Sequence, residues 1–119
     1  MRRGAVAHRL GHDAEAVAAV ALRRDGWTIL AERHRNAGGE LDLIAEKAGL
    51  LAFIEVKARP SLRDAAYALT PRQQGRLMRA AEAWLASNPG HGAVGIRFDV
   101  ILVAADGTAR RIADAFRIG

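Results

Sequence analysis

Two short stretches of alternating apolar and charged residues, 40–43 and 54–58, constrain the fold of this chain most strongly. Side chains on a β-strand point alternately to opposite faces, so a strand at either stretch has one apolar face and one charged face. The apolar faces are expected to carry Leu41 with Leu43 and, on the second strand, Ile54 with Val56 and Ala58. The charged faces are expected to carry three carboxylates and a lysine, namely Glu40, Asp42, Glu55 and Lys57.

The connection between the two stretches determines which charged residues meet. Residues 46–51 have the hydrophilic, glycine-containing character of a hairpin turn. A loop with an even number of residues, centred between Ala48 and Gly49, gives two facing pairs across the strands: Asp42 with Glu55, and Glu40 with Lys57. A loop with an odd number of residues sends the first pair to opposite faces and removes any shared site.

The facing carboxylates admit two interpretations. Directly opposed Cβ atoms lie about 4.5–5.5 Å apart, and one Mg²⁺ with oxygen ligands at about 2.0–2.1 Å can be held by both Asp42 and Glu55. A metal held there, with a lysine beside it, can position a water against a phosphate, which makes a metal-dependent nuclease one hypothesis. The alternative is a solvated sheet face with cross-strand ion pairs. It suits Glu40 with Lys57 but not the two facing carboxylates, which repel each other.

Length and charge narrow the class of protein. The 119 residues are expected to form one domain, residues 1–119, with a substantial core. The net charge of +5 comes from 18 basic and 13 acidic residues, and every basic residue except Lys47 and Lys57 is arginine. Arginine binds phosphate through two parallel hydrogen bonds, so the composition favours a nucleic-acid partner. A genome rich in G and C would also supply arginine in place of lysine.

The composition also argues against several classes of protein. The chain has no cysteine, so it can form neither a disulfide nor a thiolate metal site. No apolar run approaches the roughly 20 residues that span a bilayer. The basic residues near the N-terminus are not followed by a long hydrophobic segment of the kind found in a secretory signal. We therefore expect a cytoplasmic protein with no membrane partner.

The helix and strand signals predict the order helix, three strands, helix, two strands. Thr70 is placed to cap the second helix, with Pro71 in its first turn and Gln73 completing a capping box. The strands that flank this helix can pair in parallel through it, which predicts a mixed sheet. The expected ranges are a helix over about 10–24, strands at 27–32, 40–46 and 50–58, a helix ending at 88–90, and strands at 96–104 and 110–115. Residues 33–39 are expected to form a basic loop.

These motifs together resemble the restriction-endonuclease-like PD-(D/E)XK superfamily and, more narrowly, the bacterial YraN family. The similarity runs from about residue 11 to residue 116, and its ordered set of motifs is specific, although a lone E-x-K pattern in a strand is weak. The matching stretches are 11–15 (GHDAE), 39–45 (GELDLIA), 53–57 (FIEVK), 70–71 with 76–77, and 97–100 (RFDV). The resemblance implies an α/β fold with a restriction-endonuclease-like core, a mixed β-sheet flanked by helices.

The resemblance also implies roles for individual residues. Asp42 and Glu55 would be metal ligands, joined by the backbone carbonyl of Val56, with Mg²⁺ or Mn²⁺ as the cofactor. Lys57 would orient or activate the attacking water. Glu15 matches the acidic residue that completes the site in Holliday-junction-resolvase-like members, which cut branched DNA as dimers. A homodimer is therefore also expected from the resemblance.

Arginines near the expected site could bind the nucleic-acid backbone. Arg72, Arg76 and Arg79 recur at helical spacing on the polar side of the second helix, where they form either a phosphate-binding stripe or an ordinary solvated face. Two further arginines border the site, Arg35 and Arg59. Gln73 stands where the family often has lysine, which would weaken a phosphate contact there, and the capping box offers Gln73 a structural role.

The function predicted from the sequence is hydrolysis of phosphodiester bonds in DNA, structured or branched, by a metal-dependent nuclease. The principal alternative is a nucleic-acid-binding module that keeps the fold but performs no chemistry.

Overall fold

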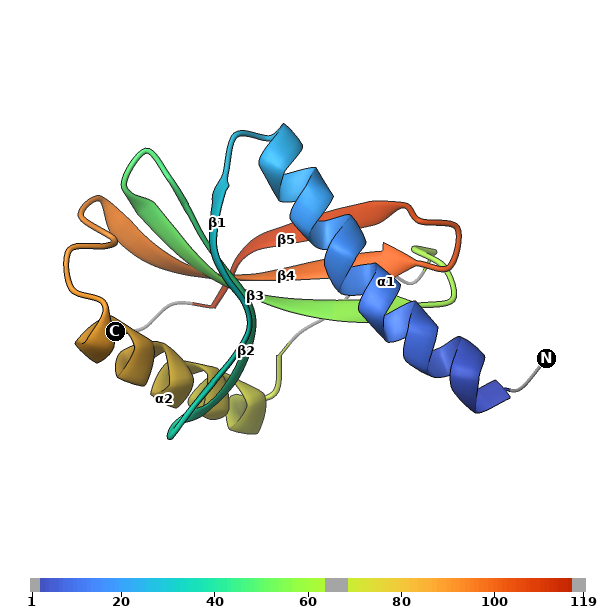
Figure 1. Cartoon of the computed structure of the whole chain (residues 1–119), viewed down its shortest axis with the longest axis horizontal. Helices are drawn as coiled ribbons and strands as arrows, with labels where there is room; N and C mark the ends of the chain where they lie inside the picture. The colour runs from blue at the N-terminus through green and yellow to red at the C-terminus, as the bar shows by residue number, and fades with distance from the viewer. Residues whose placement is uncertain (1–2, 64–68, 117–119) are drawn as a thin grey trace.

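The computed structural model describes residues 3–63 and 69–116, and side chains within 14–63 and 69–114. Its strands form one sheet in the order β1-β2-β3-β4-β5, in which β3 and β4 are parallel and all other neighbours are antiparallel. The predicted mixed α/β fold is confirmed (Figure 1). The elements are α1 (Arg3–Arg24), β1 (Thr28–Asn36), β2 (Gly39–Lys47), β3 (Leu50–Arg59), α2 (Pro71–Ser87), β4 (Gly95–Ala104) and β5 (Ala109–Phe116).

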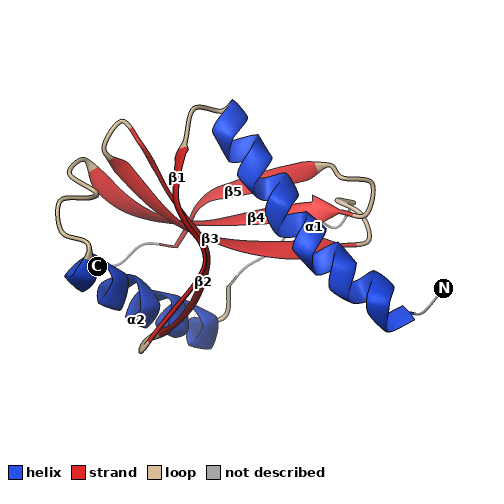
Figure 2. Ribbon diagram, viewed as in Figure 1, coloured by secondary structure: helices blue, strands red, loops and turns tan. Residues whose placement is uncertain are grey.

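The two helices cover opposite faces of the sheet, because successive residues of β3 and β4 alternate between two apolar clusters. Helix α1 lies across one face and α2 packs under the other (Figure 2). The cluster beneath α1 contains small and branched residues, among them Ala18, Leu22, Ile54 and Ile101. In the described part of the chain, neither helix is both long enough and apolar enough to cross a membrane.

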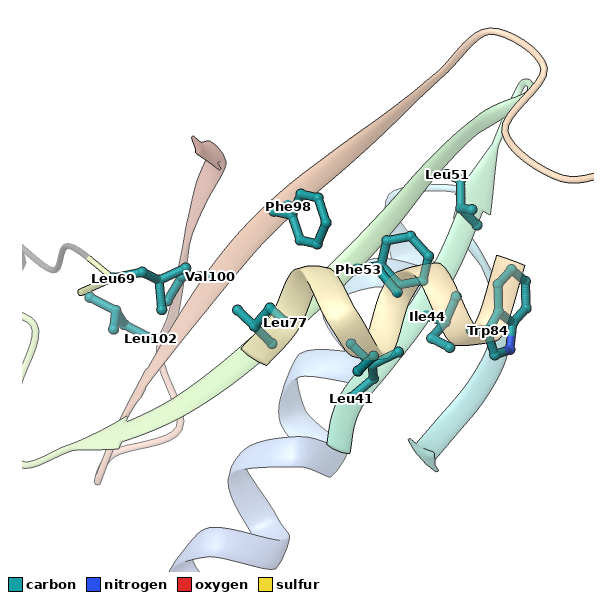
Figure 3. Packing of buried hydrophobic residues seen from close by; sticks show 12 residues of the cluster. Leu41, Ile44, Leu51, Phe53, Leu69, Leu77, Trp84, Phe98, Val100 and Leu102 are labelled. Carbon is teal, nitrogen blue, oxygen red and sulfur yellow. The ribbon is translucent and has the colours of Figure 1, made fainter. Parts of the chain in front are cut away.

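The cluster beneath α2 contains the buried aromatic side chains of Phe53, Trp84 and Phe98 (Figure 3). Phe53 of β3 is 1% exposed and lies at its centre. Its ring stacks on Phe98 at a centroid distance of 5.6 Å and meets Trp84 of α2 edge to face at 5.8 Å. These are favourable aromatic geometries, so Phe53 fixes both the neighbouring strand and the helix to β3.

The start of α2 forms as the sequence predicts. The Thr70 hydroxyl accepts a hydrogen bond from the Gln73 amide at 3.2 Å, and the Gln73 side-chain oxygen accepts from the Thr70 amide at 2.8 Å. Pro71 occupies the first helical position, where its missing N–H costs nothing. The capping box therefore uses the acceptor oxygen of Gln73 and fixes the first turn of the helix.

The hairpin between β2 and β3 also has the predicted geometry. Lys47 pairs with Leu50 across a two-residue turn in which Ala48 has φ 50° and Gly49 has φ 82°. Positive φ at both central residues matches the type I′ turn, whose twist suits a right-twisted hairpin. The loop is therefore even and centred where it was expected.

The loop predicted over 33–39 is wrong. Strand β1 continues to Asn36 and pairs with β2 down to Gly39, leaving a turn of only two residues. The Asn36 side chain stabilises this turn, since its oxygen accepts from the Gly38 amide at 2.8 Å and its amide donates to the Ala80 carbonyl of α2 at 2.9 Å. A Cβ on Gly38 would lie 2.4 Å from the Arg79 carbonyl oxygen, so only glycine allows this approach to α2.

Smaller differences concern the ends of elements. Helix α1 begins at Arg3, earlier than the range of about 10–24 read from the sequence, in which Gly4 and Gly11 left the start of the helix open. The other strands extend the predicted ranges by one or two residues.

Candidate functional site

The site begins where β2 and β3 stop pairing. Their ladder runs from Lys47–Leu50 to Leu43–Ile54, one pair short of the expected partners Asp42 and Glu55. There the Asp42 carboxylate accepts a hydrogen bond from the Val56 amide at 2.8 Å. A side-chain oxygen thus takes a backbone donor that a regular ladder would have used.

The predicted alternation of β2 fails at the same point. Leu41 packs in the α2 cluster, whereas Leu43 packs in the α1 cluster, although both were expected on one face. The strand therefore changes face at Asp42, and the view in Figure 1 shows β1 and β2 curving together toward α2. The β1–β2 turn lies against α2 at this end, where Asn36 donates to the Ala80 carbonyl and the pairing of β2 with β3 has ended. On β3 the predicted alternation is confirmed.

A pocket of about 300 Å³ opens between the parted strands and α2. Its walls combine carboxylates from the sheet with polar side chains and a cation from the helix. The lining residues are Gly39, Glu40, Asp42, Glu55, Gln73, Arg76 and Leu77. The structure thus brings the two predicted carboxylates together in one pocket, as the even hairpin loop requires.

Glu55 supplies the clearest indication that the pocket suits a cation. Its Oε1 lies 3.3 Å from the ammonium of Lys57, and its side chain is 18% exposed. Its Oε2 is buried and has no hydrogen-bond partner among the described residues. A buried carboxylate oxygen without a partner is costly, and carboxylate oxygens are the donors that Mg²⁺ and Mn²⁺ accept. The donor set therefore fits a hard divalent cation.

The electrostatics of Asp42 point the same way. Burial raises the pKa of Asp42 above its ordinary value, and the hydrogen bond from the Val56 amide acts against that rise. The charge of Glu55 raises this pKa further, while Lys57 lowers it. Two carboxylates in one pocket destabilise each other's ionised form, and a bound cation would relieve that cost.

Within the part of the chain that is described, no three acidic, histidine or cysteine side chains gather closely enough to hold a metal.

The third predicted acid, Glu15, stands apart from the pocket lining. It is on α1, and its Oε2 accepts a hydrogen bond from the Nε of Arg33 at 2.6 Å. Burial raises the pKa of Glu15, and the charges of Asp42 and two other glutamates add to that rise. Glu15 is therefore close enough to the site to sense its charge. Arg33 was not identified from the sequence, where it was assigned to a loop.

The expected pairing of Glu40 with Lys57 is absent from the ion pairs between described residues, since each has another partner. Lys57 contacts Glu55, as above, while Glu40 accepts from the Nε of Arg35 at 3.0 Å across the β1–β2 pair. Because β2 turns away from β3 at Asp42, the residues before it can no longer face β3.

The five predicted phosphate-binding arginines fall into different surroundings. Arg76 is exposed and lines the pocket opposite the carboxylates, whereas Arg72 and Arg79 are exposed outside it. Arg35 borders the pocket through Glu40. The guanidinium of Arg59, at the end of β3, donates to the Ala58 carbonyl at 2.9 Å.

The motif at residues 97–100 lies away from the pocket and has a structural role. Asp99 is 1% exposed and accepts two hydrogen bonds from the Arg97 guanidinium, at 2.9 and 2.8 Å. It also accepts from the Asp114 amide at 2.7 Å, which links β4 to β5. A buried carboxylate satisfied in this way needs no ligand.

Comparison with known proteins assigns the family. The family model described as Uncharacterised protein family UPF0102 matches residues 14–103, which include Asp42, Glu55 and Lys57. Among curated relatives, a UPF0102 protein of Granulibacter bethesdensis is 54% identical over 116 residues, covering 98% of this chain and 73% of the relative. A relative from Bradyrhizobium sp. (strain ORS 278) is 56% identical over 110 residues, covering 92% of this chain and 78% of the relative. One from Rhodopseudomonas palustris is 51% identical over 110 residues, covering 92% and 85%. The chain therefore belongs to the UPF0102 family, the YraN-like family that its motifs resemble.

Proposed function

We propose that this protein is a metal-dependent nuclease that hydrolyses phosphodiester bonds in DNA. The observation that carries the proposal is the unpartnered, buried Oε2 of Glu55. Glu55 lines the same pocket as Asp42, and its other oxygen, Oε1, lies beside the Lys57 ammonium. A solvated sheet face would leave such an oxygen in water. The opposite wall of the pocket carries Arg76, a cation suited to the negatively charged backbone of the substrate.

Asp42, Glu55 and the backbone carbonyl of Val56 would hold Mg²⁺ or Mn²⁺. The bound metal would supply positive charge to the scissile phosphate, which accumulates negative charge as the reaction proceeds. Three protein ligands leave positions for water and phosphate, as is usual for Mg²⁺.

Lys57 would act on the attacking water. Its ammonium lies 3.3 Å from Glu55 Oε1, so a charge-assisted contact holds it beside a carboxylate that lines the pocket. From that position it can orient the water whose oxygen forms the new bond to phosphorus while the bond to the leaving sugar oxygen breaks. It also lies where its charge can stabilise the phosphate oxygens during the step.

Arg76 would orient the phosphate from the helix side of the pocket. Gln73 precedes it by one helical turn, and its side-chain oxygen accepts from the Thr70 amide. The role that the family often gives to a lysine near the start of this helix would then pass to Arg76, because guanidinium is well suited to bind phosphate.

The alternative function is a nucleic-acid-binding module without chemistry. The position of Gln73 in the capping box favours it, since no lysine is present there. Such a module would still bind the DNA backbone through the arginines around the pocket, but it would have no use for the unpartnered oxygen of Glu55. We therefore place it second.

The deciding experiment is incubation of the purified protein with duplex, forked and four-way DNA, with Mg²⁺ or Mn²⁺ and with EDTA. We expect metal-dependent cleavage, strongest on structured or branched DNA, and none with EDTA or with Glu55→Gln. Light scattering of the same samples tests the proposed homodimer. DNA binding without cleavage by any metal would favour the binding module. We place the activity in the cytoplasm, where bacterial DNA lies.

A further inference from the structure

A guanidinium holds the acidic side chain that α1 contributes near the site. Arg33 Nε donates to Glu15 Oε2 at 2.6 Å, with the two side chains 52% and 26% exposed. This short contact between opposite charges joins β1 to α1. Glu15 does not line the pocket that contains Asp42 and Glu55.

Arg33 has an unusual backbone conformation at the position that contacts Glu15. Arg33 has φ 50°, a left-handed conformation that non-glycine residues adopt only at some cost. The pairs Glu32–Leu43 and His34–Leu41 flank it, so the register places Arg33 across from Asp42. Both strands are therefore irregular at one cross-strand position, where Asp42 bonds the Val56 amide and Arg33 bonds α1.

Glu15 is in the electrostatic field of the site although it lies outside the pocket lining. Burial raises the pKa of Glu15, and the charges of Asp42, Glu32 and Glu40 raise it further. An ionised carboxylate in such a negative neighbourhood needs a positive partner. In this structure that partner is the guanidinium of Arg33, and a divalent cation between Asp42 and Glu55 would be a second possible partner.

We propose that Arg33 is a positioning residue that competes with the metal for Glu15, and that a phosphate of bound DNA removes this competition by binding the Arg33 guanidinium. The proposal rests on the metal site proposed above and adds to it a coupling between the two ligands. Because binding couplings are reciprocal, DNA would tighten metal binding and metal would tighten DNA binding by the same factor.

The first test measures Mn²⁺ affinity in the absence of DNA, by electron paramagnetic resonance of the free ion. Arg33→Gln is expected to bind Mn²⁺ about two- to fivefold more tightly than the parent, the factor that corresponds to loss of one half-exposed ion pair. Arg33→Lys, which keeps the charge, is expected to remain close to the parent. Thermal melts establish that each variant is folded.

Two controls separate competition for Glu15 from a general change in charge. Arg23→Gln removes another arginine from an exposed pair, Arg23 with Glu32 at 3.9 Å, and is expected to leave Mn²⁺ affinity at the parent value. In a Glu15→Gln background, adding Arg33→Gln is expected to cause no further tightening, because the contested carboxylate is gone. Equal tightening by Arg23→Gln, or tightening that persists without Glu15, would overturn the proposal.

The second test measures the coupling itself. Affinity for a phosphorothioate duplex that resists cleavage is measured by fluorescence anisotropy with and without Mn²⁺. The parent is expected to bind the duplex more tightly with Mn²⁺, and Arg33→Gln is expected to lose most of that gain. An undiminished gain in Arg33→Gln would refute the competition while leaving the metal site intact. Mn²⁺ binding that survives Glu55→Gln would instead refute the metal site, and the competition with it.

Discussion

The two ends of the β2–β3 hairpin are made from the same two strands, yet they do different work. At the turn end the strands stay paired, and side chains there, such as Ala45 and Ala52, are fully buried in the cluster beneath α1. At the other end the pairing stops after Leu43–Ile54, and carboxylates face a pocket. The difference arises from what satisfies the backbone. Paired strands satisfy each other, whereas the parted strand needs Asp42 to accept from the Val56 amide.

Two acids of β2, four residues apart, express this contrast electrostatically. Near the turn, hydrogen bonds from the Gly92 amide and the His91 ring lower the pKa of Glu46. At the parted end, burial raises the pKa of Asp42. The turn end therefore favours its ionised carboxylate, whereas the parted end disfavours its own, a cost that a bound cation would reduce. The turn end, which is stable by itself, therefore serves as scaffold, and the parted end is the candidate binding site.

The largest effect should come from comparing the two lysines of the chain. Lys57 lies at the parted end beside Glu55, and Lys47 lies at the turn end, where its ammonium donates to the Asp25 carbonyl. Lys57→Ala is expected to lower the cleavage rate by about 10²–10⁴, typical for loss of a positioned catalytic group, with DNA affinity nearly unchanged. Lys47→Ala removes the same charge and is expected to leave the rate unchanged. Equal losses from both variants would mean that only net charge matters.

The next largest effect concerns stability at the paired end. Phe53→Ala empties a site that is 1% exposed and packed against Phe98 and Trp84. Truncating a buried phenylalanine typically costs about 3–5 kcal/mol in the free energy of unfolding. Urea denaturation measures this, with Lys57→Ala as the matched change in the same strand, expected to be nearly neutral. If Lys57→Ala destabilised the protein as much, the division between scaffold and site would be wrong.

The sequence predicts the scaffold better than the site, for physical reasons. The turn at Ala48 and Gly49 and the capping box of Thr70 and Gln73 depend on local backbone bonds, so residues a few positions apart determine them. Because this turn has an even number of residues, Asp42 and Glu55 come together in one pocket.

The parting of the strands depends on a long-range contact instead. Gly38 fits against the Arg79 carbonyl of α2, so the β1–β2 turn lies on this helix, and the pairing of β2 with β3 stops before that end of β2. No pattern within β2 reveals that α2 will be there, so alternation wrongly placed Leu41 and Leu43 on one face. For the same reason the left-handed conformation of Arg33, and its contact with Glu15, could not be found from the sequence.

A smaller effect should distinguish the two acids of β2 by opposite responses to pH. Asp42→Asn is expected to leave the metal-free protein equally or more stable, by about 0.2–1 kcal/mol, because it removes repulsion with Glu55. Since the folded pKa of Asp42 is raised, the cost in the parent fades as the pH falls through that pKa. The stability of the parent should therefore rise relative to that of Asp42→Asn as the solution is acidified.

Glu46→Gln should behave in the opposite way. The folded pKa of Glu46 is lowered, so its contribution is present above the unfolded pKa and is lost as the pH falls through the folded pKa. The parent should exceed this variant in stability at neutral pH and lose that advantage in acid. Thermal melts from about pH 7 to about pH 3 measure both differences, and parallel curves would show that the ends do not differ electrostatically.

Mg²⁺ should stabilise the parent by mass action and Asp42→Asn much less.

The smallest effect tests whether the parted end, rather than the surface in general, receives the DNA backbone. Each phosphate contact on duplex DNA contributes about −0.9 to the slope of log K against log[salt]. Arg76 lines the pocket, so Arg76→Gln should flatten that slope by about one unit, equally for all base sequences, because phosphate contacts position the DNA without selecting bases. Arg72 and Arg79 are on the same helix outside the pocket. If the DNA binds at the pocket, Arg72→Gln and Arg79→Gln should flatten the salt slope less than Arg76→Gln. If a stripe along the helix binds phosphates, all three variants should flatten it equally. Arg110→Gln on the edge strand β5, exposed and two strands from β3, serves as the control for loss of charge alone. If Arg110→Gln flattened the slope as much as Arg76→Gln, the DNA would be attracted by the diffuse field of the whole basic surface, and the parted end would not be a preferred DNA-binding site.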